Sequence, residues 1–197
     1  MKPVAVLLRD EWADWESGYL LGAVGFFLGT RAAIATPQGA TVRSAGGMRA
    51  SADVSIETLV PSDYSAIVLI GAPAWLESEP SITNLLLSAE KAALPIGAIC
   101  AGTVPLARAG LLDRRSHTSN GVGYLDGHAR EYRGADRYKD SSTAIVDRGV
   151  VTAPGTAPST FAVSLLRLAS PSSETVLQGL LALSAREHGN AGSGSPA

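Results

Sequence analysis

The amino-acid sequence predicts one α/β domain, built on a mostly parallel sheet that helices cover on both faces. Two patterns predict this class. Short apolar runs, typical of strands buried on both faces, occur at residues 4–8, 66–70 and 95–99. Segments with apolar residues at helical spacing alternate with these runs, at 14–28, 80–93 and 101–109. In such a sheet, functional residues gather beyond the carboxyl ends of the strands.

The remaining elements follow from local signals, and we expect a single domain over residues 1–188. A short strand at 32–35 ends before a Pro/Gly turn, and a Gly-Gly turn at 46–47 separates two short strands within 40–55. Residues 112–142 are polar and rich in loops, and a hairpin joins 144–146 to 150–152. Helices follow at about 158–169 and 172–187. The small, polar residues 189–197 predict a disordered tail.

Composition excludes several classes of function. The chain has 197 residues, a net charge of −2 and no basic run, so we expect no nucleic-acid partner. No uncharged apolar stretch is long enough to span a bilayer, and no signal peptide is evident, which predicts a soluble, cytoplasmic protein. One cysteine, no histidine spacing of a metal site and no phosphate-binding glycine motif predict neither metal nor nucleotide cofactor.

Cys100 is the first candidate for chemistry. It follows a buried strand and precedes Ala101, Gly102 and a helix, the pattern of a nucleophile elbow. A helix amino terminus favours the thiolate, and we expect the N–H groups of Ala101 and of Ala72, after the turn at Gly71, to stabilise an oxyanion. The alternative is a buried free cysteine that acts as a small apolar residue.

Glu16 is the second candidate. Glu11 and Asp14 are expected in a solvated loop and at the helix start, where Asp14 could be the N-cap. Glu16 instead opens an apolar helix directly after Trp15, so we expect it to point toward the strand ends. A partly desolvated carboxyl beside a cysteine would have a raised pKa and could donate a hydrogen bond to sulfur.

Other residues are candidates for substrate contact. His117, in the loop-rich region, could act as a base for Cys100 or lie at the surface without a role. The Gly/Pro turn at 153–159 could line a pocket through its N–H groups, Thr156 or Ser159, or could be a plain helix start. Trp12, Trp15 and Trp75 could wall an apolar pocket or belong to the core.

With these residues in view, the sequence resembles the ThiJ/PfpI family of the class I glutamine amidotransferase-like superfamily over residues 3–169. The resemblance rests on four motifs in order: residues 14–16, residues 67–71 with Trp75, residues 98–102 leading to 106–112, and residues 151–156 before 161–162. It implies a flavodoxin-like three-layer sandwich, usually dimeric, in which a strained nucleophilic Cys100 is hydrogen-bonded to Glu16, with Ala72 and Ala101 as oxyanion donors.

Two departures from the family pattern bear on the activity. Protease-like members carry a histidine directly after the nucleophile, where this chain has Ala101. Other members carry one two residues after a threonine in the next loop; counting from Thr118, that position is Asn120. Both departures weigh against proteolysis and leave Asn120 to orient substrate or sulfur.

The sequence therefore leads to a main hypothesis and alternatives. The main hypothesis is a homodimeric cysteine hydrolase or amidotransferase-like enzyme that acts on a small carbonyl or amide substrate. In it, Cys100 attacks, Glu16 shuttles the proton, and no metal or cofactor takes part. The alternatives are a redox-sensing or stress-protective protein with an oxidisable Cys100, and a pseudoenzyme whose cysteine persists through fold strain.

Overall fold

The protein folds around a seven-stranded sheet, and the computed structural model describes residues 2–189. The strand order is β5-β2-β1-β6-β7-β9-β8, and every pairing is parallel except that of β8 with β9. The strands are β1 Val4–Leu7, β2 Ala32–Thr36, β5 Val54–Ser55, β6 Ala66–Leu69, β7 Ile96–Ile99, β8 Ile145–Asp147 and β9 Val150–Ala153. Every residue of β1, β6, β7 and β9 is buried, and the mostly parallel sheet is confirmed.

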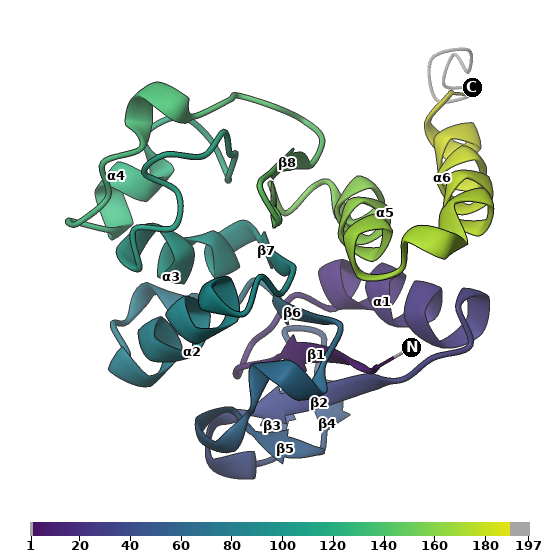
Figure 1. Ribbon diagram of the computed structural model, residues 1–197, viewed down its shortest axis with the longest axis horizontal. Helices are drawn as coiled ribbons and strands as arrows, with labels where there is room; N and C mark the ends of the chain where they lie inside the picture. The colour runs from purple at the N-terminus through teal and green to yellow at the C-terminus, as the bar shows by residue number, and fades with distance from the viewer. Residues whose placement is uncertain (1, 190–197) are drawn as a thin grey trace.

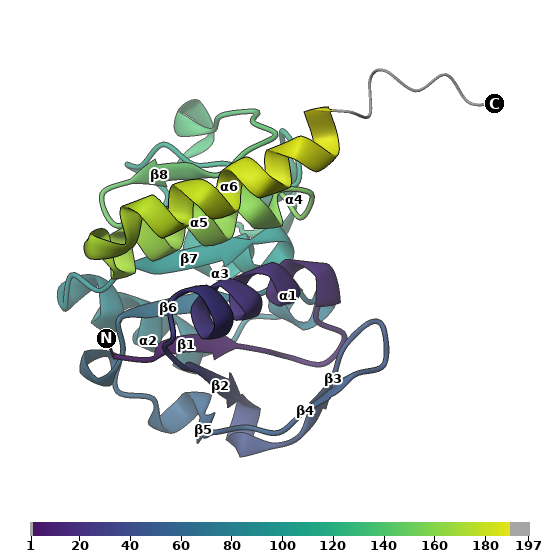
Figure 2. The ribbon, with the colours of Figure 1, turned by 90° about the vertical axis from the view of Figure 1, so that its right-hand side faces the viewer.

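Helices cover both faces of this sheet, as Figures 1 and 2 show. On one face lie α1 Asp14–Gly22, α5 Pro158–Ala169 and α6 Glu174–Gly189, with α5 packed against both α1 and α6. On the other lie α2 Pro80–Lys91, α3 Thr103–Arg108 and α4 Tyr124–His128. A π-helical turn, Ala23–Phe27, continues α1. The predicted three-layer, flavodoxin-like sandwich is therefore confirmed.

A small hairpin lies beside the main sheet. Its strands, β3 Val42–Arg43 and β4 Arg49–Ala50, pair antiparallel across the Gly-Gly turn that the sequence predicts. The carboxylate of Asp14 accepts the N–H of Gly46 at 2.7 Å and so ties α1 to this turn. Ala13 is the N-cap of α1, which makes the expected capping role of Asp14 wrong: its side chain faces the hairpin instead.

The carboxyl-terminal region follows the predicted helices. The helix α6 begins at Glu174, two residues later than expected, because Pro171–Ser173 forms a separate 3₁₀ turn. Of the predicted disordered tail, Gly189 closes α6, and residues 190–197 lie outside the described part of the chain. Within residues 2–189, no helix has both the length and the apolar character needed to cross a bilayer.

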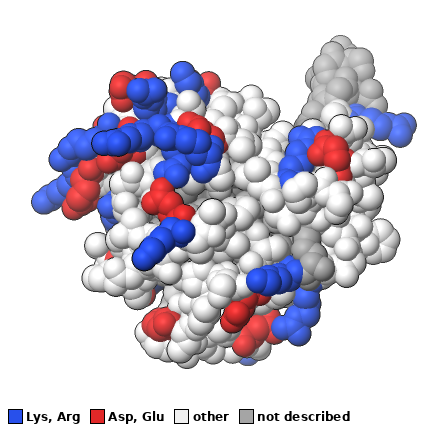
Figure 3. All heavy atoms as spheres, in the orientation of Figure 1, with Lys and Arg blue, Asp and Glu red and all other residues white. Residues whose placement is uncertain are grey.

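Charged side chains of both signs share the surface. On the face shown in Figure 3, Lys and Arg lie together with Asp and Glu over the region of α4. Elsewhere on the molecule, some charged side chains form ion pairs, for example Arg9 with Glu79 and Arg115 with Glu90. The mixture agrees with the small net charge of −2.

Candidate active site

Cys100 occupies a strained turn between β7 and α3. Its φ is +57°, a left-handed conformation that costs free energy for any residue other than glycine. The chain passes through a 3₁₀ turn, Cys100–Gly102, before α3 begins. A Cβ on Gly102 would lie 2.5 Å from the carbonyl oxygen of Leu69, so only glycine fits there. The predicted elbow is present, and its half-buried cysteine lies at the carboxyl edge of the sheet.

Glu16 reaches the same edge from α1. The residue is 0% exposed, and its Oε2 accepts the N–H of Gly71 at 2.8 Å. The Cys100 thiol lies beside this carboxyl group, close enough for each group to influence the pKa of the other. Among the described residues, Oε1 is buried and receives no hydrogen bond from a nitrogen or oxygen donor. The carboxyl group therefore has one fixed anchor on the backbone and one oxygen left for the sulfur or for a bound molecule.

Two glycines permit this close approach of cysteine and glutamate. A Cβ on Gly71 would lie 2.6 Å from Glu16 Oε2 and 2.7 Å from Cys100 Cβ. A Cβ on Gly155 would lie 2.8 Å from Glu16 Oε1 and 3.2 Å from Cys100 Sγ. Both positions face the reacting groups directly, so any side chain there would displace one of them.

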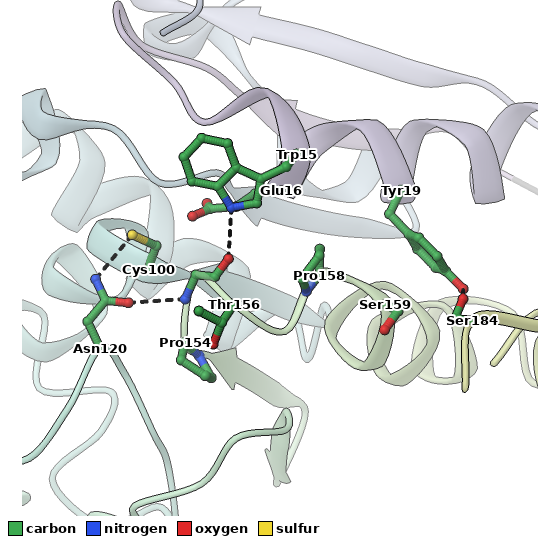
Figure 4. A pocket seen from close by; sticks show the side chains of 11 residues that line it. Trp15, Glu16, Tyr19, Cys100, Asn120, Pro154, Thr156, Pro158, Ser159 and Ser184 are labelled. Carbon is green, nitrogen blue, oxygen red and sulfur yellow. Dashed lines mark hydrogen bonds between the residues drawn. The ribbon is translucent and has the colours of Figure 1, made fainter. Parts of the chain in front are cut away.

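A chain of hydrogen bonds holds Asn120 against the sulfur (Figure 4). Trp15 donates its indole N–H to the carbonyl of Gly155 at 2.9 Å, and Gly155 donates its N–H to Asn120 Oδ1 at 3.1 Å. With its oxygen occupied in this way, the Asn120 amide presents its NH₂ group to Cys100 Sγ at 3.1 Å. Asn120 is thus a fixed donor to sulfur that does not titrate.

Burial sets the protonation of the pair. It raises the pKa of Glu16 from its ordinary value of 4.5 to about 7, against the N–H of Gly71 and the nearby Cys100 thiol, which act to lower it. Burial, and then the charge of Glu16, raise the pKa of the Cys100 thiol, while donors on Asn120 and Ala101 act to lower it. Burial and the charge of Glu16 thus act against the thiolate that the helix terminus was expected to favour. Glu16 is instead a base whose pKa lies near neutrality.

Replacing Asn120 by Ala is expected to raise the pKa of the Cys100 thiol further, by about one unit, since a donor to the thiolate is lost. The pH dependence of alkylation by iodoacetamide measures this shift. Asn84→Ala, an exposed site on α2, serves as the matched control and should leave the curve in place. An unchanged thiol pKa in Asn120→Ala would show that the contact with sulfur has no electrostatic effect.

The turn after β6 and the elbow hold the two predicted oxyanion donors, the N–H groups of Ala72 and Ala101. The N–H of Gly71 is bonded to Glu16 and is not available to a substrate. Ala101 directs its N–H toward the sulfur, and both Ala72 and Ala101 line a hollow beside Cys100. The role of Ala72 and Ala101 as oxyanion donors therefore stays a prediction.

Two of the predicted contact residues lie away from the sulfur. His117 is 0% exposed; its Nδ1 lies 2.7 Å from the carbonyl oxygen of Arg115 and its Nε2 lies 2.6 Å from the hydroxyl of Tyr132. Trp75 is 1% exposed and donates its indole N–H to the carbonyl of Ile70 at 2.6 Å. Substrate contact is therefore wrong for both residues: Trp75 belongs to the core, the alternative that the sequence left open, and His117 is buried with both ring nitrogens bonded inside the fold.

The other predicted contacts border a cavity of about 790 Å³ that opens beside Cys100. Trp15, Asn120 and Thr156 all line it, from three segments far apart in the sequence. Tyr19 and Ser184, which were not among the predicted contacts, line the same cavity and bond to each other. Tyr19 lies one helical turn after Glu16 on α1, and this spacing is the signal that would have found it.

Fold and site together define a class: α/β proteins with a cysteine on a nucleophile elbow beside a buried carboxyl group. A sequence model of the DJ-1/PfpI family matches residues 2–168. The chain is 33% identical over 171 residues to the uncharacterized protease YdeA of Bacillus subtilis, covering 85% of this chain and 83% of that protein. The chain belongs to the DJ-1/PfpI family, as the sequence motifs predict.

Solved structures agree with this assignment. The DJ-1 superfamily protein Atu0886 from Agrobacterium tumefaciens has a TM-score of 0.85 and 34% identity, with 95% of this chain and 100% of that chain covered. The thiJ/pfpI family protein from Bacillus anthracis has a TM-score of 0.77 and 25% identity, with 90% of this chain and 96% of that chain covered. The shared fold extends over nearly the whole described chain.

Proposed function

We propose that this protein is a cysteine-dependent enzyme of hydrolase or amidotransferase type, acting on a small carbonyl or amide substrate. One observation carries the proposal: the thiol of Cys100, on its strained elbow, lies beside a buried Glu16 whose pKa is raised to about 7. A general base works best when its pKa lies near the working pH. An ordinary buried cysteine would have no such partner.

The reaction begins when ionised Glu16 takes the thiol proton as Cys100 Sγ attacks the carbonyl carbon. The new C–S bond pushes the carbonyl π electrons onto oxygen, where the N–H groups of Ala72 and Ala101 hold the charge. Collapse of this intermediate breaks the bond to the leaving group, which takes the proton from Glu16. Water then attacks the thioester as Glu16 accepts one of its protons. The C–S bond breaks, the acid product leaves, and Glu16 returns the proton to the thiolate.

The absence of a histidine at the family positions supports a small substrate over a polypeptide. YdeA and a second relative, YoaZ of Bacillus subtilis, carry the name of uncharacterized proteases. In this chain Ala101 follows the nucleophile and Asn120 contacts it, so the proton must move through Glu16. A base of pKa about 7 suits activated carbonyl compounds, whose leaving groups need less assistance than a peptide amine.

A second candidate function is a redox response of Cys100. It is favoured by Glu16 Oε1, which among the described residues is buried without a nitrogen or oxygen donor and faces the sulfur region. If a peroxide oxidised the thiolate to sulfinate, the protonated carboxyl group could donate to a sulfinate oxygen and hold the product. This candidate needs a peroxide and no organic substrate.

Turnover of esters, amides and 2-oxoaldehydes by the wild type and by Cys100→Ser tests the proposal. We expect hydrolysis of at least one class, lost by at least about 10³-fold in the variant because the hydroxyl is a far weaker nucleophile at this pH. Unchanged turnover in Cys100→Ser would eliminate the cysteine mechanism. No turnover, together with clean conversion of Cys100 to sulfinate by mild peroxide in mass spectra, would favour the redox candidate.

A further inference from the structure

Two hollows meet at the sulfur of Cys100. The larger, of about 790 Å³, is bordered by Glu16, Asn120 and hydroxyl-bearing side chains of α1, α5 and α6. The smaller, of about 360 Å³, is bordered mainly by apolar side chains and by the turn after β6. Cys100 and Trp15 line both. A molecule that reacts with the sulfur can therefore extend in two directions.

The groups needed for catalysis are divided between these hollows. Ala72 and Ala101, the candidate oxyanion donors, line the smaller one. Glu16, the proton carrier, lines the larger one together with Asn120. The carbonyl oxygen must lie near the first pair and the leaving group near the second, since each needs its own partner. Under the proposed function, this division orients the substrate at the sulfur.

The linings differ in chemistry as well. Ala13, Pro73 and Leu76 give the smaller hollow an apolar wall, and Tyr124 adds an aromatic ring. Glu11 also lines it, so an anionic group would be repelled there.

The larger hollow carries the hydroxyls of Thr156 and Ser159, which have no protein hydrogen-bond partner within residues 2–189. These two hydroxyls can bind a polar ligand without breaking an existing contact.

We propose that the substrate is an ester, thioester or amide with a short, uncharged apolar acyl group and a polar, hydroxyl-bearing leaving group. The acyl group occupies the hollow of Leu76 and Tyr124, and the leaving group occupies the hollow of Thr156 and Ser159. This inference rests on the proposed function, since it assigns the two sides of the bond that Cys100 cleaves. Leu76, Tyr124, Thr156 and Ser159 are then specificity residues.

Acetyl, propanoyl and butanoyl p-nitrophenyl esters test the acyl side, with the leaving group held constant. We expect kcat/KM to rise about fourfold for each added methylene, as burial of a CH₂ predicts. In Leu76→Ala the rise should fall to about twofold per methylene, because part of the apolar wall is removed. Leu87→Ala, an exposed leucine on α2, is the matched control and should keep the fourfold rise.

Glyceryl and propyl butanoates test the other side, since they differ only in the hydroxyls of the leaving group. We expect the glyceryl ester to be cleaved about fivefold faster for each hydroxyl that is bound, a preference reduced in Thr156→Val and in Ser159→Ala. The acyl-chain dependence should be the same in these two variants as in the wild type.

The two ester series distinguish a failure of the substrate assignment from a failure of the proposed function. A burst of p-nitrophenolate with an acyl adduct on Cys100, but equal rates along the acyl series or no glyceryl preference, overturns the inference and leaves the proposed function standing. No burst and no adduct with any ester overturns the proposed function, and the assignment of the hollows with it. A Leu87→Ala variant that behaves like Leu76→Ala would also contradict the assignment.

Discussion

Replacing Glu16 by Gln is expected to lower kcat/KM for reactions of Cys100 by about 10²- to 10⁴-fold, the usual contribution of a general base. Because burial raises the pKa of Glu16 to about 7, the base form accumulates as the pH rises through that value. Wild-type activity should therefore rise between about pH 6 and pH 8 with an apparent pKa of about 7. The variant should lose this step, and a pH–rate profile of turnover measures it.

Glu131→Gln, an exposed site, is the matched control and should keep the wild-type profile. If Glu16→Gln retained both the rate and the step at pH 7, Glu16 would not be the base. A rate loss with the step intact would identify Glu16 as a group that only positions the thiol.

The same variant should change how stability depends on pH. The carboxyl group of Glu16 loses its proton near pH 4.5 in the unfolded chain and near pH 7 in the folded protein. Between these values the folded state binds more protons, so its stability falls as the pH rises, by about 3 kcal/mol in all. Glu16→Gln removes this decline, and urea unfolding at pH 4.5 and pH 8 measures the difference between the two proteins.

Replacing Gly71 by Ala is expected to disrupt the site and destabilise the fold together. The added methyl group would lie 2.6 Å from Glu16 Oε2 and 2.7 Å from Cys100 Cβ, so one of the two residues must move. Overpacking of this kind costs about 1–3 kcal/mol. Because misplacement by about 1 Å can cost 10²-fold in rate, we expect turnover to fall by about that factor or more. Chemical denaturation and single-turnover kinetics measure the two effects.

Gly18→Ala is the control for this substitution. Gly18 lies on the same helix as Glu16, and no atom lies within 4 Å of the position that an added methyl group would take. Alanine there should stabilise α1 by up to about 1 kcal/mol. Gly71→Ala with wild-type stability and turnover would contradict the tight packing of Glu16 and Cys100.

Much of the architecture could be predicted because its signals are local. The apolar runs of β1, β6 and β7 predict strands buried on both faces, and the small residues after Cys100 predict a sharp turn into a helix. The two residues of β5 were missed, since a strand of that length has no periodicity to detect.

Contacts between distant segments could not be predicted in the same way. His117 is buried, and Tyr132, fifteen residues later, bonds to its ring nitrogen. No spacing in the sequence predicts that pair. Trp15 is bonded to Gly155 across 140 residues, and Gly155 to Asn120 across 35. These links depend on how α1, the loop after α3 and the turn after β9 meet at one sheet edge.

Residue types at fixed short spacings were enough to specify the family, the sheet, the elbow of Cys100 and the inward position of Glu16. The protonation of the pair and the two hollows that border it emerged only in the folded chain. Burial raises the pKa values of both Cys100 and Glu16, and the proposed role of the glutamate as a base depends on this rise. Desolvation is a property of the surrounding atoms, and these come from segments that only folding brings together.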